Sequence, residues 1–390
     1  MFRKRLGLVA AFAGLGGTAA TIPAMLPSLE ARLDASVLPA VPLLFGGLLV
    51  GVLLSAPLLV RVRVRTVVIA GSALQAGALF WLAAATSLPE ILVIAACAGA
   101  GFGLTEAAGS VAAKRWERGS ATRSLAMLTA AVAVVAALSP IAVAFLPGGV
   151  WLVPVLVAVI HLLACGAIAR VEESITVPGE AAETDGPRWT PAARRVLVVA
   201  GVALALYVGV ETVFSGWSAL IPAAVLDIDP QSAALGTSGF WLCMAAGRVI
   251  AAAVLRMGVQ PVVLLLACMA VAAAALLLTS LLAPSAVMLV GLGVAVLAMA
   301  PVYSLVLGEA LDRLSPQAAA RATGPLVACG ALGGTMVPMV LVAAGLEPDN
   351  VATFLVAAGI CIIIGAGALA TLAAPTASPR HSSTHQGVSP

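Results

Sequence analysis

Twelve apolar stretches of close to 20 residues constrain the fold of this chain more than any other feature of its sequence. An α-helix rises about 1.5 Å per residue, so about 20 residues are needed to cross the ~30 Å hydrocarbon core of a bilayer. The pattern therefore predicts an all-α integral membrane protein with twelve transmembrane helices. The expected spans are residues 6–28, 38–60, 66–87, 91–113, 124–146, 150–169, 196–222, 231–254, 261–282, 285–308, 322–344 and 351–374.

The composition excludes the soluble classes of protein. Hydrophobic residues make up 62% of the chain and charged residues only 9%, whereas a soluble domain is roughly 25% charged. A formal net charge of +3 is too small to indicate nucleic acid as a partner. The six cysteines lie in apolar runs without metal-ligand spacing, so we expect no metal and no cofactor. The expected partners are the lipid bilayer and a small solute, and we expect a monomer.

Lysine and arginine residues are distributed unevenly between the loops. If the amino terminus lies on the inner side, all but two of the 20 Lys and Arg residues fall on that side, and the exceptions are Arg32 and Arg248. Basic residues of short loops are retained in the cytoplasm. The distribution therefore predicts a multi-pass protein of the cell (plasma or inner) membrane with both termini in the cytoplasm.

The longest polar segment inside the chain, residues 170–195, divides it into two halves of six stretches each. Gly99 and Gly101 of the fourth stretch recur as Gly291 and Gly293 of the tenth, which indicates a weak internal repeat. We therefore expect two pseudo-symmetric six-helix bundles. Their expected bounds are 1–169 and 196–374, with a cytoplasmic linker at 170–195 and a disordered tail at 375–390.

Several short segments resemble those of a known transporter family. They are Tyr207-Val-Gly209-Val-Glu211 followed by Gly216-Trp217; Gly101-x-Gly103-x-x-Glu106-x-x-x-Ser110; the small-residue run Gly324 to Gly334; and Phe240-Trp241 followed by Gly247-Arg248. These segments resemble the major facilitator superfamily, and in particular its fucose:proton symporter group and uncharacterised bacterial relatives. The resemblance implies the major facilitator fold, alternating access and a solute site at mid-membrane between the halves.

The chain also departs from the family pattern. Ser110 stands where the group usually has Asn, and the loop containing Arg61, Arg63 and Arg65 lacks the usual Asp and glycines. The fifth stretch contains no glycine, unlike the glycine- and proline-rich fifth span common in proton-coupled drug exporters. This difference makes an exporter the less favoured alternative.

Glu106 and Glu211 are the acidic residues placed well inside the expected spans. Placing an ionisable group at the centre of a bilayer costs at least about 2.5–3.5 kcal/mol of free energy, so such a residue is a candidate for a functional role. An unpaired carboxylate in apolar surroundings is stable mainly when protonated, so such a group can load and release a proton. We therefore expect Glu106 and Glu211 to take part in proton coupling. The resemblance implies the same role for Glu106, the acidic residue of the fourth span.

Aromatic and hydroxyl side chains share helical stripes with these acids, because residues three or four apart lie on one face of a helix. Rings and hydroxyls beside a carboxylate suit a polyol. The expected substrate-binding residues are Phe102, Ser110, Tyr207, Glu211, Phe214, Ser215 and Ser218. The alternative for Glu211 is a protonated side chain that closes an interhelical hydrogen bond.

Arg248 lies within an expected span, eight residues from Arg256, and Glu309 is placed near the inner rim beside Asp312 and Arg313. We expect Arg248 and Glu309 to form a structural charge pair.

These observations together predict a secondary transporter rather than an enzyme. The favoured function is proton-coupled uptake of a small polar, sugar-like solute. One alternative is a proton-coupled exporter of drug-like or amphipathic metabolites. The alternative from another class is a membrane sensor or scaffold that does not transport, against which stands the lack of a soluble domain to deliver a signal.

Overall fold

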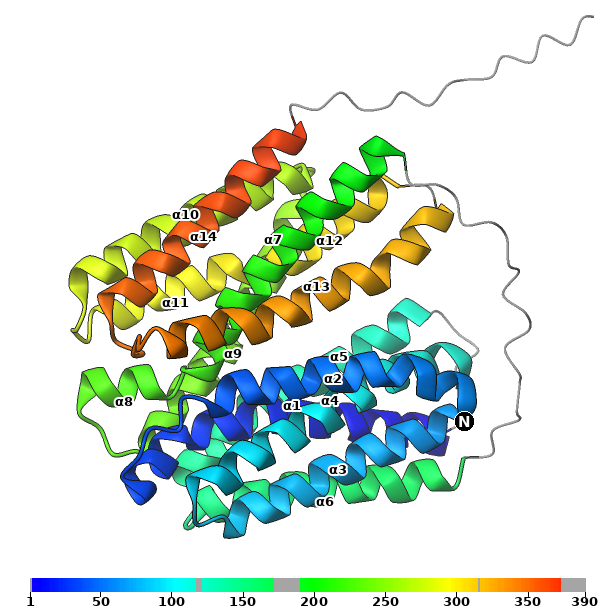
Figure 1. Cartoon of the computed structure of the whole chain (residues 1–390), viewed down its shortest axis with the longest axis vertical. Helices are drawn as coiled ribbons and strands as arrows, with labels where there is room; N and C mark the ends of the chain where they lie inside the picture. Colours follow the sequence, from blue (N-terminus) through cyan, green and yellow to red (C-terminus); the bar gives the residue numbers. More distant parts are fainter. Residues whose placement is uncertain (1, 117–120, 172–189, 315, 373–390) are drawn as a thin grey trace, which may run out of the picture.

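The computed structural model describes residues 2–116, 121–171, 190–314 and 316–372, which fold into helices joined by short connections (Figure 1). Within these residues, 12 helical segments are long and apolar enough to cross a membrane. The expected number of spans is thus confirmed. The expected tail at 375–390 and most of the linker at 170–195 lie outside the described residues.

The first six helices form an amino-terminal bundle, in which α2 packs along α4 and α1 packs between α5 and α6. Their bounds are α1 Phe2–Leu33, α2 Ala40–Arg61, α3 Val64–Ala84, α4 Leu88–Trp116, α5 Ala121–Phe145 and α6 Gly149–Ala169.

The remaining helices form a carboxy-terminal bundle that repeats the packing of the first. The α1–α5 contact recurs as α7–α13, and the α3–α6 contact recurs as α10–α14. One span, Met288–Asp312, consists of the two helices α11 and α12, which meet at Ala300 and Pro301. The bounds are α7 Pro191–Gly216, α8 Leu220–Leu226, η1 Ser232–Ala234, α9 Leu235–Arg256, α10 Pro261–Leu282, α11 Met288–Met299, α12 Val302–Asp312, α13 Pro316–Ala343 and α14 Val351–Leu372.

Helix α7 begins and ends earlier than the expected span 196–222. Its start is fixed by Thr190, whose side chain accepts a hydrogen bond from the Ala193 N–H at 3.1 Å, and by Pro191 in the first turn, where a missing N–H costs nothing. Its end is at Gly216, and the chain turns through Trp217 before α8.

Glycines allow α2 and α4 to approach until their backbones touch. A methyl group added at Gly99 or Gly103 of α4 would collide with the carbonyl oxygens of Leu44 and Leu48 in α2. The same holds in the other direction for Gly51 of α2 against Ala100 of α4. Small residues at such contacts let membrane helices associate through close van der Waals packing.

The two bundles touch near one end of the molecule. We call the end that adjoins the linker the linker side and the opposite end the far side. Gln231, just before η1, donates from Nε2 to the carbonyl oxygens of Val143, Ala144 and Leu146 at the far end of α5, at 2.9, 3.3 and 3.2 Å. The Ser238 hydroxyl of α9 donates to the Ala137 carbonyl of α5 at 2.8 Å. Of these acceptors, the Val143 and Ala144 carbonyls belong to the last turn of α5, where a helix end leaves carbonyl groups without intrahelical partners.

Helices α2 and α13 form the second contact between the bundles, again toward the far side. A Cβ added at Gly46 would lie 3.3 Å from Thr335 Cγ2, and one added at Gly334 would lie 3.7 Å from the Phe45 ring. Figure 1 shows the bundles converging on the far side and diverging toward the linker side. The structure is therefore closed on the far side.

We predict that Gly99→Ala lowers the stability of the protein, because its methyl group meets the Leu44 backbone, which cannot move aside as a side chain would. The expected loss is about 1–3 kcal/mol, the usual cost of overpacking. Thermal unfolding of detergent-purified protein measures it. The matched control is Gly77→Ala in α3, where an added Cβ meets nothing within 4 Å, and this variant should be at least as stable as the native chain. Equal melting temperatures for the two variants would contradict the packing argument.

Candidate functional site

Among the Asp, Glu, Lys and Arg residues, three side chains lie well inside the described spans: Glu106 on α4, Glu211 on α7 and Arg248 on α9. His161 of α6 is a further ionisable side chain in a span, and it is fully buried against Thr18. Arg248 is 13 residues after Leu235 and 8 before Arg256, which places it near the middle of its helix. Ala300, which Arg248 contacts, is the centre of the span Met288–Asp312. The charges therefore meet near mid-membrane.

Arg248 lies between two partners in the carboxy-terminal bundle. Its Nη2 is 3.9 Å from Glu211 Oε1, which makes an ion pair but exceeds hydrogen-bond distance. Its Nε donates to the Ala300 carbonyl oxygen at a long 3.4 Å. The Arg248 side chain remains 52% exposed and the Glu211 side chain 21% exposed.

The break between α11 and α12 makes the Ala300 carbonyl available. Pro301 lacks an N–H and its ring crowds the preceding turn, so one helix cannot continue smoothly through it. Helix α11 therefore ends at Met299 and α12 begins at Val302. Carbonyls at a helix end lack intrahelical partners, and a cation is favoured beside them.

Both tyrosines of the chain lie beside this pair. Tyr207, one turn before Glu211 on α7, is 1% exposed, and its hydroxyl lies beside the Glu211 carboxylate without geometry for a hydrogen bond. Tyr303, at the start of α12, is close enough to interact electrostatically with both Glu211 and Glu106. The two carboxylates, one from each bundle, are thus both within electrostatic range of Tyr303.

The Glu106 side chain projects from α4 between the side of this helix that faces α2 and the side that faces α1. Gly103 of α4 faces α2, and Gly109 faces the Phe12 ring of α1. The Glu106 side chain is exposed although its residue lies within a span, and Phe102 and Ser110 on the same stripe are half-buried. The structure therefore groups Glu106, Phe102 and Ser110 on the inter-bundle side of the amino-terminal bundle.

Three expected substrate residues make their contacts inside the carboxy-terminal bundle instead. Phe214 is 1% exposed and stacks on Phe354 of α14, with ring centroids 6.2 Å apart. Ser215 donates to the Thr212 carbonyl at 3.1 Å, and Ser218 hydrogen-bonds Thr237 at 2.8 Å. The helical stripe that grouped Ser218 with Glu211 required α7 to continue, but α7 ends at Gly216, before Ser218. We place Phe214, Ser215 and Ser218 outside the site.

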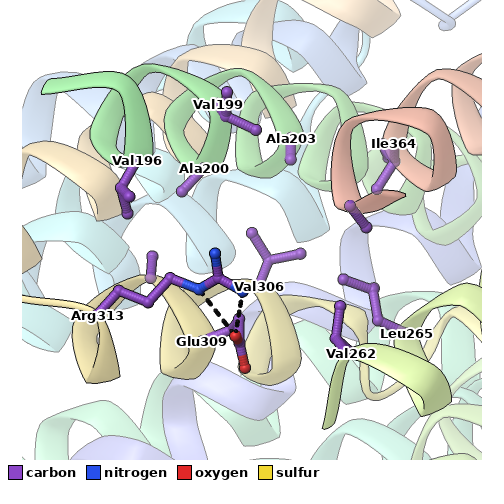
Figure 2. Close-up of a pocket in the computed structure, with 12 residues that line it drawn as sticks. Val196, Val199, Ala200, Ala203, Val262, Leu265, Val306, Glu309, Arg313 and Ile364 are labelled. Atoms are coloured by element: carbon purple, nitrogen blue, oxygen red, sulfur yellow. Dashed lines mark hydrogen bonds and ion pairs between the residues drawn. The ribbon is translucent and has the colours of Figure 1, made fainter. Parts of the chain in front are cut away.

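The expected pair of Arg248 with Glu309 is wrong in this structure. Glu309 instead accepts from the Nε and Nη2 of Arg313, one turn along α12, at 2.9 and 2.8 Å. This ion pair lies at an otherwise apolar pocket between α7, α10, α12 and α14, where Figure 2 shows Arg313 reaching back to Glu309. Glu309 is nine residues beyond Ala300, about 13 Å along the helix, so Arg248 reaches a nearer partner in Glu211.

Sequence reasoning missed Tyr303 and the stripe of α9 that carries Arg248. Trp241, Ala245, Arg248 and Ala252 recur at helical spacing, and Ala245 and Ala252 are exposed. Ile250, 50% exposed, lies two residues after Arg248 and therefore on the opposite side of the helix. The alanines leave Arg248 accessible, and the Trp241 indole N–H has no partner among the described residues. The sequence signal that could have pointed to Tyr303 is Pro301, which lies two residues before it and interrupts the helix.

A family model described as Major Facilitator Superfamily matches residues 6–338. The chain belongs to the Major Facilitator Superfamily. It is accordingly a multi-pass membrane transporter rather than an enzyme, and its fold is the major facilitator fold. In a search of curated proteins, no sequence matches the chain.

Several solved structures share the fold at low sequence identity. The nucleoside transporter NupG is 10% identical with a TM-score of 0.74, over 96% of this chain and 100% of that one. The inward-open xylose transporter XylE from E. coli is 14% identical with a TM-score of 0.72, over 93% and 95%. A D-xylose-proton symporter is 16% identical with a TM-score of 0.70, over 95% and 96%.

We predict that Glu211 and Arg248 are energetically coupled. Each single change, Arg248→Gln or Glu211→Gln, leaves the other group without its partner near mid-membrane, whereas the double change removes both charges. A double-mutant cycle on thermal stability should therefore give a coupling energy of about 0.5–3 kcal/mol. The same cycle on Arg248 and Glu309 is the control and should be additive within about 0.5 kcal/mol. Coupling of Arg248 to Glu309 alone would contradict the observed pairing.

Proposed function

We propose that the protein carries out proton-coupled uptake of a small polar, sugar-like solute by alternating access. The observation that supports this most is the convergence of Glu106 and Glu211, from different bundles, on the space beside Tyr303. Carboxylates that face a shared mid-membrane space can be reached by water from one side at a time as the bundles rock. Each can then take up a proton on one side and release it on the other.

The comparisons support the substrate class in this proposal, a small sugar-like solute. Proteins of the same fold include a xylose transporter, a D-xylose-proton symporter and a nucleoside transporter, whose solutes carry sugar rings. Together with the Tyr207 and Glu211 segment, this favours the fucose:proton symporter group as the nearest functional relatives. We place the transporter in the plasma or inner membrane as a monomer, with the linker side toward the cytoplasm.

Within this proposal the structure is an inward-facing state, since it is closed on the far side. Glu106, with Phe102 and Ser110, handles the proton and lines the solute path in the amino-terminal bundle. Glu211, with Tyr207, contacts the solute in the carboxy-terminal bundle. Movement of one bundle against the other must break the Gln231 and Ser238 hydrogen bonds to α5 before the far side can open.

Glu106→Gln, which imitates the protonated acid, should abolish accumulation driven by a pH gradient while leaving counterflow exchange of solute intact. Glu211→Gln should instead weaken solute binding, because we assign it direct contact. Uptake and exchange in proteoliposomes measure both. Glu347→Gln, an exposed acid on the far side, is the control and should change neither. Continued accumulation by Glu106→Gln would refute its role in proton coupling.

A disulfide across the far side should stop the cycle. A Cβ added at Gly216 of α7 would lie 3.2 Å from the Val41 Cβ of α2, close to the ~3.5–4.5 Å of a disulfide. In a cysteine-free background, Val41→Cys with Gly216→Cys should cross-link on oxidation and lose transport, and a reductant should restore it. The single variants are the controls. Full transport by the cross-linked protein would contradict alternating access through the far side.

A further inference from the structure

Most of the N–H donors of the Arg248 guanidinium make no hydrogen bond to the described residues. Arginine presents five N–H groups in a planar fork, and the described residues use one of them, in the long bond to the Ala300 carbonyl. Glu211 is near enough for charge compensation but, at 3.9 Å, not for the bidentate pairing that a fork and a carboxylate normally form. A half-exposed guanidinium near mid-membrane is therefore incompletely bound.

The charges around Arg248 are few. Glu211 and Tyr207 face it from α7, Tyr303 lies at the start of α12, and Glu106 lies across the inter-bundle space on α4. Helices α1, α5, α10 and α11 also pack on α9 or beside it, and they carry no charged residue in the middle of their described spans. When Glu211 takes up a proton, Arg248 loses its one close counter-ion.

We infer that the solute carries a carboxylate group, which binds Arg248 in place of the Glu211 carboxylate. This inference rests on the proposed function and narrows its substrate to small polyhydroxylated acids of the sugar-acid type. The hydroxyl groups of such a solute match the Tyr207 hydroxyl and the Trp241 N–H, which have no partner among the described residues.

The exchange keeps the charge of the site constant. A proton from water binds a Glu211 carboxylate oxygen, and the solute carboxylate takes its place beside Arg248. On the other side of the membrane the solute leaves, the proton returns to water, and Glu211 again neutralises Arg248. At this site one proton thus accompanies one monoanion, and the proton that Glu106 carries comes in addition.

A carboxylate fits this site better than a phosphate ester. Arg248 is the one Lys or Arg residue in the interior of the described spans, and the others lie at or near span ends; His161 is fully buried in the amino-terminal bundle. A phosphate monoester carries about −1.5 to −2 charges at pH 7, which a single guanidinium cannot neutralise. A carboxylate carries one negative charge and accepts two parallel hydrogen bonds from the fork.

The test is uptake into proteoliposomes with an imposed pH gradient, using pairs that differ in the acid group: galacturonate and galactose, glucuronate and glucose, gluconate and sorbitol. We expect the acid of at least one pair to accumulate and its neutral partner not to. An inside-negative membrane potential imposed with potassium and valinomycin should increase the uptake, because the proton on Glu106 adds one positive charge to each cycle. Arg248→Gln should reduce it about tenfold or more, and Arg248→Lys, which keeps the charge but loses the fork, should reduce it less.

The other outcomes separate this inference from the function on which it rests. Accumulation of the neutral sugar alone would overturn the inference and leave proton-coupled uptake standing. Acid uptake that survives Arg248→Gln would also overturn it, since transport itself shows that the variant is folded. If neither member of any pair accumulates, the proposed function fails and the inference fails with it.

Discussion

The ion pair between Arg248 and Glu211 is the interaction on which the rest of this structure depends. A guanidinium near mid-membrane is unfavourable unless something compensates its charge, and here the compensation comes from α7 and from the helix break at Ala300. Three elements of the carboxy-terminal bundle therefore meet at one side chain. The long distances of both contacts leave the guanidinium accessible from the inter-bundle space, which makes the pair suited to exchange partners.

Close packing within each bundle complements this loose polar centre. Glycines bring α2 against α4, and Gly247 of α9 similarly meets the Leu297 carbonyl of α11. The bundles touch each other mainly where α1, α2 and α5 meet α7, α9, η1 and α13, toward the far side. Two rigid bodies with a limited contact can move relative to one another without repacking their interiors, as alternating access requires.

The sequence was sufficient to predict the fold, because the length of an apolar run and the bilayer thickness together determine a span. Glu106 and Glu211 stand out in the sequence because charged groups are rare in hydrocarbon, and their roles stay predictions. Sequence reasoning failed where the outcome depended on tertiary geometry. The end of α7 at Gly216 removed Ser218 from the stripe of Glu211, and no local signal marked that end. The partner of Arg248 depends on which helices adjoin α9, which spacing along the chain does not specify.

The most direct test of the central claim is whether water reaches the Arg248 stripe from the linker side alone. Ala252, one turn from Arg248 toward that side, is replaced by cysteine in a cysteine-free background and exposed to a membrane-impermeant thiol reagent in inverted and right-side-out vesicles. Ile250→Cys, on the opposite, apolar exposed side of α9, is the control and should not react in either. The account predicts that Ala252→Cys reacts in inverted vesicles, where the linker side faces outward, and not in right-side-out ones. Lack of reaction from both sides would show that Arg248 is sealed inside the protein, and would contradict the account.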